Sequence, residues 1–136
     1  MPAKSFTVNL KSKIKSYKKV IDVDSDKSLS IRSFIIGSIC QKISFANNIL
    51  ESEDVKSTIS TCRQLGVKIV KITSKKYKIY GKGLGSFYAK KNIELDFCNS
   101  GTLARLLIGV LSTTPNIEVK IRGDHSLNKR NMKEII

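Results

Sequence analysis

The order in which strand-like and helix-like segments alternate is the feature that most constrains the fold of this chain. From Val20 the patterns read strand, helix, strand, helix, strand, strand, and from Asn92 they read strand, helix, strand, helix. Alternating apolar and polar residues are typical of a half-buried strand, whereas apolar residues three or four apart are typical of a helix. The sequence therefore predicts an α/β (α+β) fold of repeated β-α-β-α-β-β units, truncated in the second repeat.

Apolar alternation and turn residues place the predicted strands. They are expected at Phe6–Leu10, Lys18–Asp24, Ile43–Ala46, Val67–Ile72, Tyr77–Tyr80, Asn92–Phe97 and Asn116–Ile121. The first of these strands has no obvious partner nearby in the sequence. A strand needs a neighbour for its backbone hydrogen bonds, so we expect its partner to lie in another part of a longer protein.

Helices are predicted to begin near Lys27, Ser52 and Asn99. Ser52 precedes two acids, which is typical of a helix start, and Gly66 is typical of a helix stop. The expected apolar face of the first helix is Phe34, Ile35, Ile39 and Cys40, and that of the third is Leu103, Leu106, Leu107, Val110 and Leu111. A fourth helix is expected from Asn128 to Ile136, and its lack of a stop signal predicts that the natural chain continues.

The charge of the chain bears on its partners. The 136 residues carry a formal net charge of +14, which is compatible with a nucleic-acid or membrane-surface partner, with the codon bias of an AT-rich coding sequence, or with binding of small anions. Apart from Lys11–Lys19 the lysines are spread along the chain, and no strand is rich in the aromatic residues that stack on bases. We therefore expect no nucleic-acid partner.

Other function classes are disfavoured by composition. No apolar run is long enough to span a bilayer and no secretory signal is present, so no membrane is expected and a cytoplasmic location is predicted. Cys40, Cys62 and Cys98 form no C-x-x-C pair, which argues against a disulfide framework or a zinc site. His125, the single histidine, is expected to be exposed in a turn and not catalytic.

Three loop-to-helix junctions offer places where chemistry could occur, because free amides and the helix dipole attract anions there. The first is Lys27-Ser28-x-Ser30-x-Arg32, in which Arg32 lies one helical turn after Ser28. A guanidinium presents a planar fork of donors that suits a carboxylate or a phosphate. The alternative is an ordinary capped helix with solvated charges.

The other two junctions have the same character. Asn99-Ser100-Gly101-Thr102 contains a glycine, which would let a ligand approach the backbone closely, although its polar residues could also serve only as caps. The third runs from Gly123 to Arg130, with Lys129 and Arg130 expected to point to different sides, so that one of them faces a ligand or both form a surface charge pair.

Together these junctions resemble the motifs of one enzyme family. DKSLSIR, SEDVKSTISTCRQLGVKI, NSGTLARLLIGVL and GDHSLNKRNM occur in this order and are similar to the K-S-x-S-x-R, S-E-D-V…L-G-V, N-[SA]-G-T…R and G-D-x-S-L-x-K-R-P-M signatures of EPSP synthases (3-phosphoshikimate 1-carboxyvinyltransferases). The resemblance runs from about Val23 to the end of the chain. It implies a protein about three times longer, of two similar lobes with three β-α-β-α-β-β units each.

The resemblance also implies a reaction and a site. Family members transfer the enolpyruvyl group of phosphoenolpyruvate to the 5-hydroxyl of shikimate 3-phosphate. By motif, Lys27, Ser28 and Arg32 would bind shikimate 3-phosphate, and Lys27, Asn99, Gly101 and Arg130 would bind phosphoenolpyruvate. No cofactor or metal is implied. The acid and base groups would lie outside this chain, which should therefore be inactive alone.

The resemblance further divides the chain. Residues 1–22 would hold the first strands of the other lobe, and residues 23–136 would form an incomplete N-terminal lobe. A monomer is expected for the full-length protein.

Several positions depart from the family pattern. Asp24-Ser25 replaces the usual Pro-Gly, Ile31 follows Ser30 where His or Asn is common, Cys98 replaces a glycine, and Asn131 replaces a proline. None of these removes a charged binding group, but Cys98 adds bulk beside the second junction. The alternatives are a UDP-N-acetylglucosamine enolpyruvyl transferase, whose first motif typically carries Lys-Asn, and a basic nucleic-acid-binding module.

Overall fold

A computed structural model describes residues 7–9, 11, 18 and 20–131 of the chain. Its helices are α1 (Lys27–Ile39), α2 (Glu53–Gln64), α3 (Gly101–Leu111) and the short α4 (His125–Asn128). Its strands are β1 (Ile43–Ala46), β2 (Lys68–Thr73), β3 (Lys76–Tyr80), β4 (Glu94–Asp96) and β5 (Lys120–Arg122). From α1 onward the structure contains helices and strands in the predicted order, and the α/β class is confirmed.

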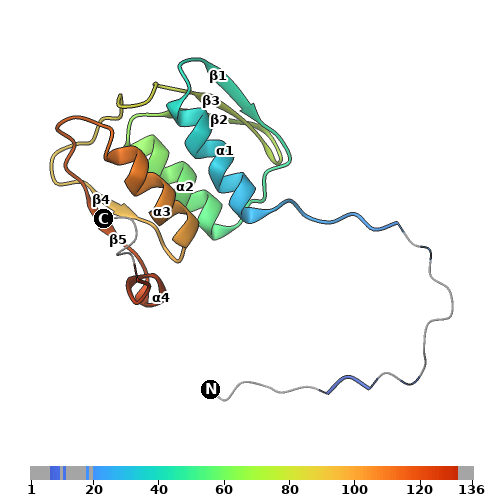
Figure 1. Cartoon of the computed structure of the whole chain (residues 1–136). Coiled ribbons are helices and arrows are strands. Elements are labelled where there is room, and N and C mark those ends of the chain that lie inside the picture. Colours follow the sequence, from blue (N-terminus) through green and yellow to red (C-terminus); the bar gives the residue numbers. More distant parts are fainter. Residues whose placement is uncertain (1–6, 10, 12–17, 19, 132–136) are drawn as a thin grey trace.

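The first half of the described chain folds into a three-stranded sheet covered by helices. The strand order is β1-β3-β2 and both pairings are antiparallel. Helices α1 and α2 pack against each other and lie on the same face of this sheet (Figure 1). The opposite face of the sheet has no described element on it.

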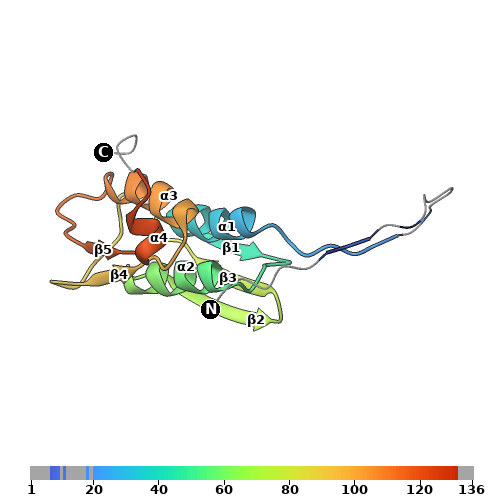
Figure 2. The same cartoon turned by 90° about the horizontal axis from the view of Figure 1, so that it is seen from below.

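The second half begins the same pattern again with a parallel pair. Strands β4 and β5 pair in parallel and are connected through α3, which is the β-α-β crossover expected of such a pair. Helix α3 packs beside α1 (Figure 2), and α2 contacts both β2 and β4. The N-terminal ends of α1, α2 and α3 consequently meet at one end of the molecule, as the contacts between their first residues show below.

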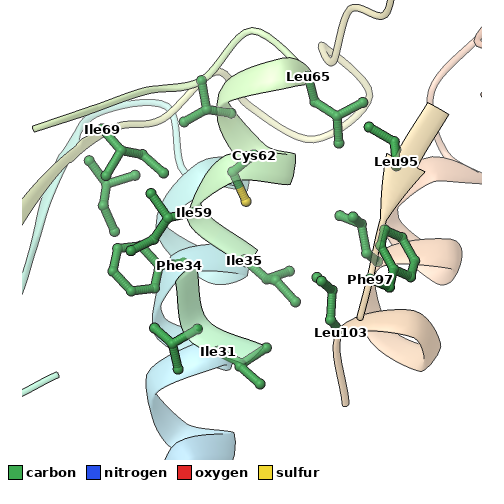
Figure 3. Close-up of a cluster of buried hydrophobic side chains, with 14 of the residues drawn as sticks. Ile31, Phe34, Ile35, Ile59, Cys62, Leu65, Ile69, Leu95, Phe97 and Leu103 are labelled. Carbon is green, nitrogen blue, oxygen red and sulfur yellow. The ribbon is translucent and has the colours of Figure 1, made fainter. Parts of the chain in front are cut away.

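One continuous core joins the two halves (Figure 3). Ile31 and Phe34 of α1 are fully buried, as are Cys62 of α2, Phe97 after β4 and Leu103 of α3. The rings of Phe34 and Tyr77, a residue of β3, form an edge-to-face pair with their centroids 5.2 Å apart. Burial of side chains from every layer fixes how the helix ends are placed relative to one another.

Two predicted strands are not found among the residues that the structure describes. Phe6 and Leu10 lie outside the described residues, and the described residues between them, 7–9, form no strand. The predicted strand Lys18–Asp24 is wrong for its described residues, which are extended without a pairing strand, and Val20 and Val23 are 92% and 78% exposed. Apolar alternation alone gives no strand where no neighbouring strand accepts its hydrogen bonds.

Helices α3 and α4 differ from their predictions. Leu106 was predicted to face inward and is instead 38% exposed, while Leu103, Leu107 and Leu111 are buried. The helix predicted from Asn128 begins at His125, because the Asp124 carboxylate accepts the Leu127 amide at 2.7 Å and caps it there. This helix ends at Asn128, and the positions after residue 131 lie outside the described residues. His125 is exposed, as expected.

Candidate functional site

At the start of α1, some polar residues stabilise the helix itself and others face the neighbouring helix α3. The Asp26 carboxylate caps the helix by accepting the Leu29 amide at 2.7 Å. The Ser30 hydroxyl donates to the Asp26 carbonyl at 2.8 Å and accepts the Leu50 amide at 3.0 Å, so it ties α1 to the loop before α2. Ser30 is therefore structural, and Ser28 and Arg32 are the polar groups of this motif that remain on the side of α3.

A hydroxyl contact places the start of α1 against the start of α3. The Ser28 Oγ lies 3.4 Å from the Thr102 Oγ1, with either hydroxyl able to donate. Because Arg32 follows Ser28 by one helical turn, and Arg105 follows Thr102 by nearly one, the two arginines extend from adjacent faces of the two helices. The first and second motifs are thus brought together in space.

Arg130 lies directly on the N-terminal end of α3. Its Nη2 donates to the Asn99 Oδ1 at 2.6 Å. A Cβ added at Gly101 would lie only 2.5 Å from the Arg130 Nη1, far inside any real contact distance. Glycine at position 101 is therefore what allows this guanidinium to reach the helix end. Ser100 caps the helix by accepting the Leu103 amide at 3.2 Å.

These groups surround one cavity of about 370 Å³, called the arginine cavity below. It is lined by Arg32, Gly101, Thr102, Arg105, Leu106 and Arg130. Three guanidinium groups line it and no described carboxylate does. With the α3 amides at its edge, the cavity has the charge and the donors to hold a phosphate or a carboxylate.

Lys27 lies apart from the arginine cavity. Its Nζ forms an ion pair with the Asp54 carboxylate of α2 at 2.7 Å, and its side chain remains 49% exposed. Asp54 and Asn99 line a second cavity of about 450 Å³ that also contains Glu53, Asp96, Arg122 and Asp124. Lys27 thus lies near this second cavity, and Asp54 offsets its charge. Asn99 lines the second cavity and accepts a hydrogen bond from Arg130, which lines the arginine cavity.

The loop before α3 has a backbone conformation that cysteine adopts with strain. Cys98 has a φ of 48°, in the left-handed region that favours glycine. Its amide donates to the Asp96 carboxylate at 2.8 Å, and this bond, followed by Arg122, lowers the pKa of Asp96. Burial raises the pKa of the Cys98 thiol, which disfavours a reactive thiolate there.

The predicted site residues fall into three groups. Arg32, Gly101 and Arg130 line the arginine cavity. Ser28 and Asn99 do not line it, but they contact Thr102 and Arg130, which do. Lys27 forms its ion pair with Asp54. Lys129 does not line the arginine cavity.

Two functional candidates were missed from the sequence. Arg105 was visible as the arginine that ends the N-S-G-T…R motif, and its spacing from Thr102 was the available signal. Asp54 was interpreted only as a helix-dipole partner, although it also forms the ion pair with Lys27. Its place beside Lys27 depends on how α1 and α2 pack, which a sequence pattern does not give.

The described part of the chain has neither a cluster of metal-binding side chains nor a helix that could span a membrane. No three described His, Cys, Asp or Glu side chains lie together as a metal site would require. No described helix has the length and apolar character to cross a membrane.

Comparison with known proteins identifies relatives of this chain. The sequence profile of the family described as EPSP synthase (3-phosphoshikimate 1-carboxyvinyltransferase) matches residues 11–136. The 3-phosphoshikimate 1-carboxyvinyltransferase of Syntrophomonas wolfei is 40% identical over 127 residues, which is 93% of this chain and 29% of the relative. The protein of the same name from Alkaliphilus oremlandii is 41% identical over 130 residues, 96% of this chain and 29% of the relative.

A solved structure gives the same result. The EPSP synthase of Acinetobacter baumannii superposes with a TM-score of 0.74 at 35% sequence identity, covering 83% of this chain and 25% of that chain. The chain therefore spans less than a third of the length of the curated relatives it matches. Sequence profile, relatives and fold agree, and the chain belongs to the EPSP synthase family.

Proposed function

We propose that this chain provides the anion-binding half of an active site that transfers the enolpyruvyl group of phosphoenolpyruvate to the 5-hydroxyl of shikimate 3-phosphate, with release of phosphate. The observation that carries the proposal is the arginine cavity, in which Arg32, Arg105 and Arg130 face one space that no described carboxylate lines. Family membership supplies the reaction, and the cavity supplies a physical reason for it.

The chemistry requires two multiply charged anions to come together. In water they repel each other, and fixed cations that are already in place lower the cost of that approach. Arg32 and Arg105 are carried by packed helices, and Arg130 is bonded to Asn99, so these cations already lie at the cavity when the anions arrive. The N-terminal ends of α1 and α3, which meet at Ser28 and Thr102, add partial positive charge from the same side.

Individual roles follow the motif assignments. Ser28 and Arg32 bind shikimate 3-phosphate in this proposal, Asn99, Gly101 and Arg130 bind phosphoenolpyruvate, and Lys27 contacts both. The Lys27–Asp54 ion pair must then open or shift when the substrates bind. Because the Lys27 side chain is half exposed and solvent screens the pair, opening it should cost little, on the order of 1 kcal/mol.

The rest of the site is proposed to come from the parts of the family that this chain does not span. Acid and base groups for proton transfer lie there, and the chain alone binds substrates weakly without turnover. Residues 1–22 belong to the other lobe in this proposal, and residues 23–136 to the N-terminal lobe. The cytoplasmic location and the monomeric state of the full-length protein stay predictions.

A chimera tests the proposal. The chain replaces the matching segment of the Syntrophomonas wolfei relative, and phosphate release is measured with phosphoenolpyruvate plus either shikimate 3-phosphate or UDP-N-acetylglucosamine. In the presence of phosphoenolpyruvate, phosphate release is expected with shikimate 3-phosphate and not with the UDP-sugar. Arg130→Ala in the chimera should abolish most of this release. Lys91→Ala, in an exposed turn, removes the same charge elsewhere and serves as control. Release with the UDP-sugar, or full activity of the Arg130→Ala chimera, would overturn the proposal.

A further inference from the structure

The outer face of the three-stranded sheet is an exposed surface that the proposed function does not use. Figure 1 shows α1 and α2 on the other face of the sheet. Alternation along the paired strands directs six side chains to the outer side: Ile43, Phe45, Lys68, Val70, Lys78 and Tyr80. Phe45 is 57% exposed, Ile43 48% and Val70 39%. We call this surface the open sheet face.

All formal charge on the open sheet face is positive. Strands β1, β2 and β3 contain no Asp or Glu, and Lys68, Lys76 and Lys78 project from this face. The Glu51 carboxylate is bonded to Lys71 and Tyr77, whose positions in the strands belong to the opposite side of the sheet. A second copy of this face would meet it with like charges, so the charge favours an anionic partner.

Aromatic rings and lysines alternate across the neighbouring strands. Lys78 stands opposite Phe45 in the register, and its Nζ lies 5.9 Å from the Phe45 ring centroid and 5.0 Å from that of Tyr80. Lys68 stands opposite Tyr80 with its Nζ 5.0 Å from the same ring. A lysine therefore lies beside each ring. If a base stacked on the ring, this lysine could pair with the phosphate attached to that base.

We propose that the open sheet face binds single-stranded nucleic acid, with bases stacked on Phe45 and Tyr80 and backbone phosphates paired with Lys68, Lys76 and Lys78. A flat sheet that presents one ring from each of two adjacent strands is a known solution for stacking unpaired bases. Duplex is excluded by the same geometry, because its bases are not free to stack on a protein ring. The proposal is independent of the enolpyruvyl transfer proposed above, since it shares no residue with that site.

The sequence led to the opposite expectation for a physical reason. Strand β3 contains two tyrosines, but Tyr77 and Tyr80 face opposite sides of the sheet, and Phe45 and Tyr80 are 35 positions apart in the chain. Only the pairing of β1 with β3 makes them neighbours.

Fluorescence anisotropy with a labelled single-stranded RNA of mixed sequence tests the proposal on the 136-residue chain. Phe45→Ala is expected to weaken binding at least fivefold, because a stacked base contributes about 1 kcal/mol or more. Lys78→Ala is expected to lower the slope of log affinity against log salt by about 0.7. Phe45→Leu keeps the apolar side chain without the ring and should weaken binding similarly if Phe45→Ala proves poorly folded.

Matched controls distinguish this face from general charge attraction. Tyr88→Ala removes a ring that is 62% exposed in a loop outside the sheet, and Lys91→Ala removes an exposed charge from a turn. Both should bind like the parent chain. Equal losses in control and sheet variants, equal affinity for a duplex of the same length, or sheet variants that alter binding only to anionic lipid vesicles would each overturn the proposal.

Discussion

Replacing Gly101 by alanine separates the binding role of the α3 N-terminus from its structural role. The added Cβ would lie 2.5 Å from the Arg130 Nη1 and 3.6 Å from its Cζ. The atom in the way belongs to the end of a flexible side chain, so the guanidinium moves and the helix does not. Arg130 then loses its bond to Asn99, and its position in the arginine cavity is lost with it.

The size of the effect follows from that displacement. A hydrogen bond to a charged group contributes about 1.5–3 kcal/mol, and the lower end applies because this one is exposed to solvent. That corresponds to roughly tenfold weaker binding of an anion. Folding stability should change little, because the better helix propensity of alanine offsets the loss of the Arg130–Asn99 bond.

Isothermal titration with shikimate 3-phosphate and with phosphoenolpyruvate measures the first quantity, and urea unfolding measures the second. Gly109→Ala is the matched control, because Gly109 lies in the same helix and an added Cβ there meets nothing within 4 Å. It should stabilise the chain by up to about 1 kcal/mol and leave binding unchanged. Parental affinity in Gly101→Ala would refute the argument that Arg130 acts from its place over this glycine.

Three further predictions concern the framework of the site. Leu103→Ala, at a fully buried position of α3, should cost about 2–5 kcal/mol of unfolding free energy in urea, and a loss below 1 kcal/mol would contradict the core described. Hydrogen bonds from Lys71 and then Tyr77 lower the pKa of Glu51 from 4.5 to about 2, so its stabilising contribution is present above pH 4.5 and is lost as pH falls toward 2. Glu51→Gln should therefore flatten the acid limb of stability measured from pH 5 to 2, and an unchanged limb would refute this. Cys98→Val should lower stability by about 1–2 kcal/mol because a β-branched residue tolerates a positive φ poorly, whereas Cys98→Gly should not; equal thermal unfolding of the two variants would contradict the strain.

Local signals predicted the elements whose formation is itself local. Helix α2 begins after Ser52 and ends before Gly66, whose φ of 88° is the left-handed stop that glycine supplies. The Ser52 hydroxyl, however, makes no capping bond, so the position was right and the mechanism was not. The acids in the first turn still favour this start through the helix dipole.

Predictions that depended on distant partners were less successful. Ile21 and Val23 alternate with Asp22 and Asp24 as in a strand, yet no described strand pairs with this segment. Leu106 fits the apolar period of α3, but α1 and Arg130 leave space at that side, and the residue lines the arginine cavity. Burial at such positions is decided by what packs against the element, which periodicity does not contain.

The candidate site shows the same division. Motif spacing indicated Arg32, Gly101 and Arg130, and the structure brings these three to one cavity. The pairing of Lys27 with Asp54 follows from the packing of α1 on α2 and had no counterpart in the sequence. Binding of substrate by any of these residues stays a prediction.

The central claim is that Arg32 and Arg130, nearly a hundred positions apart in the chain, line one cavity that binds the anionic substrates. Nuclear magnetic resonance of the arginine Nε–Hε groups during titration with shikimate 3-phosphate or phosphoenolpyruvate tests it most directly. Both side-chain signals should shift along a single saturation curve with one dissociation constant for a given ligand, while Arg63, which is bonded to the Ile69 carbonyl, should not move. Separate curves for Arg32 and Arg130, or shifts confined to surface lysines, would contradict the claim.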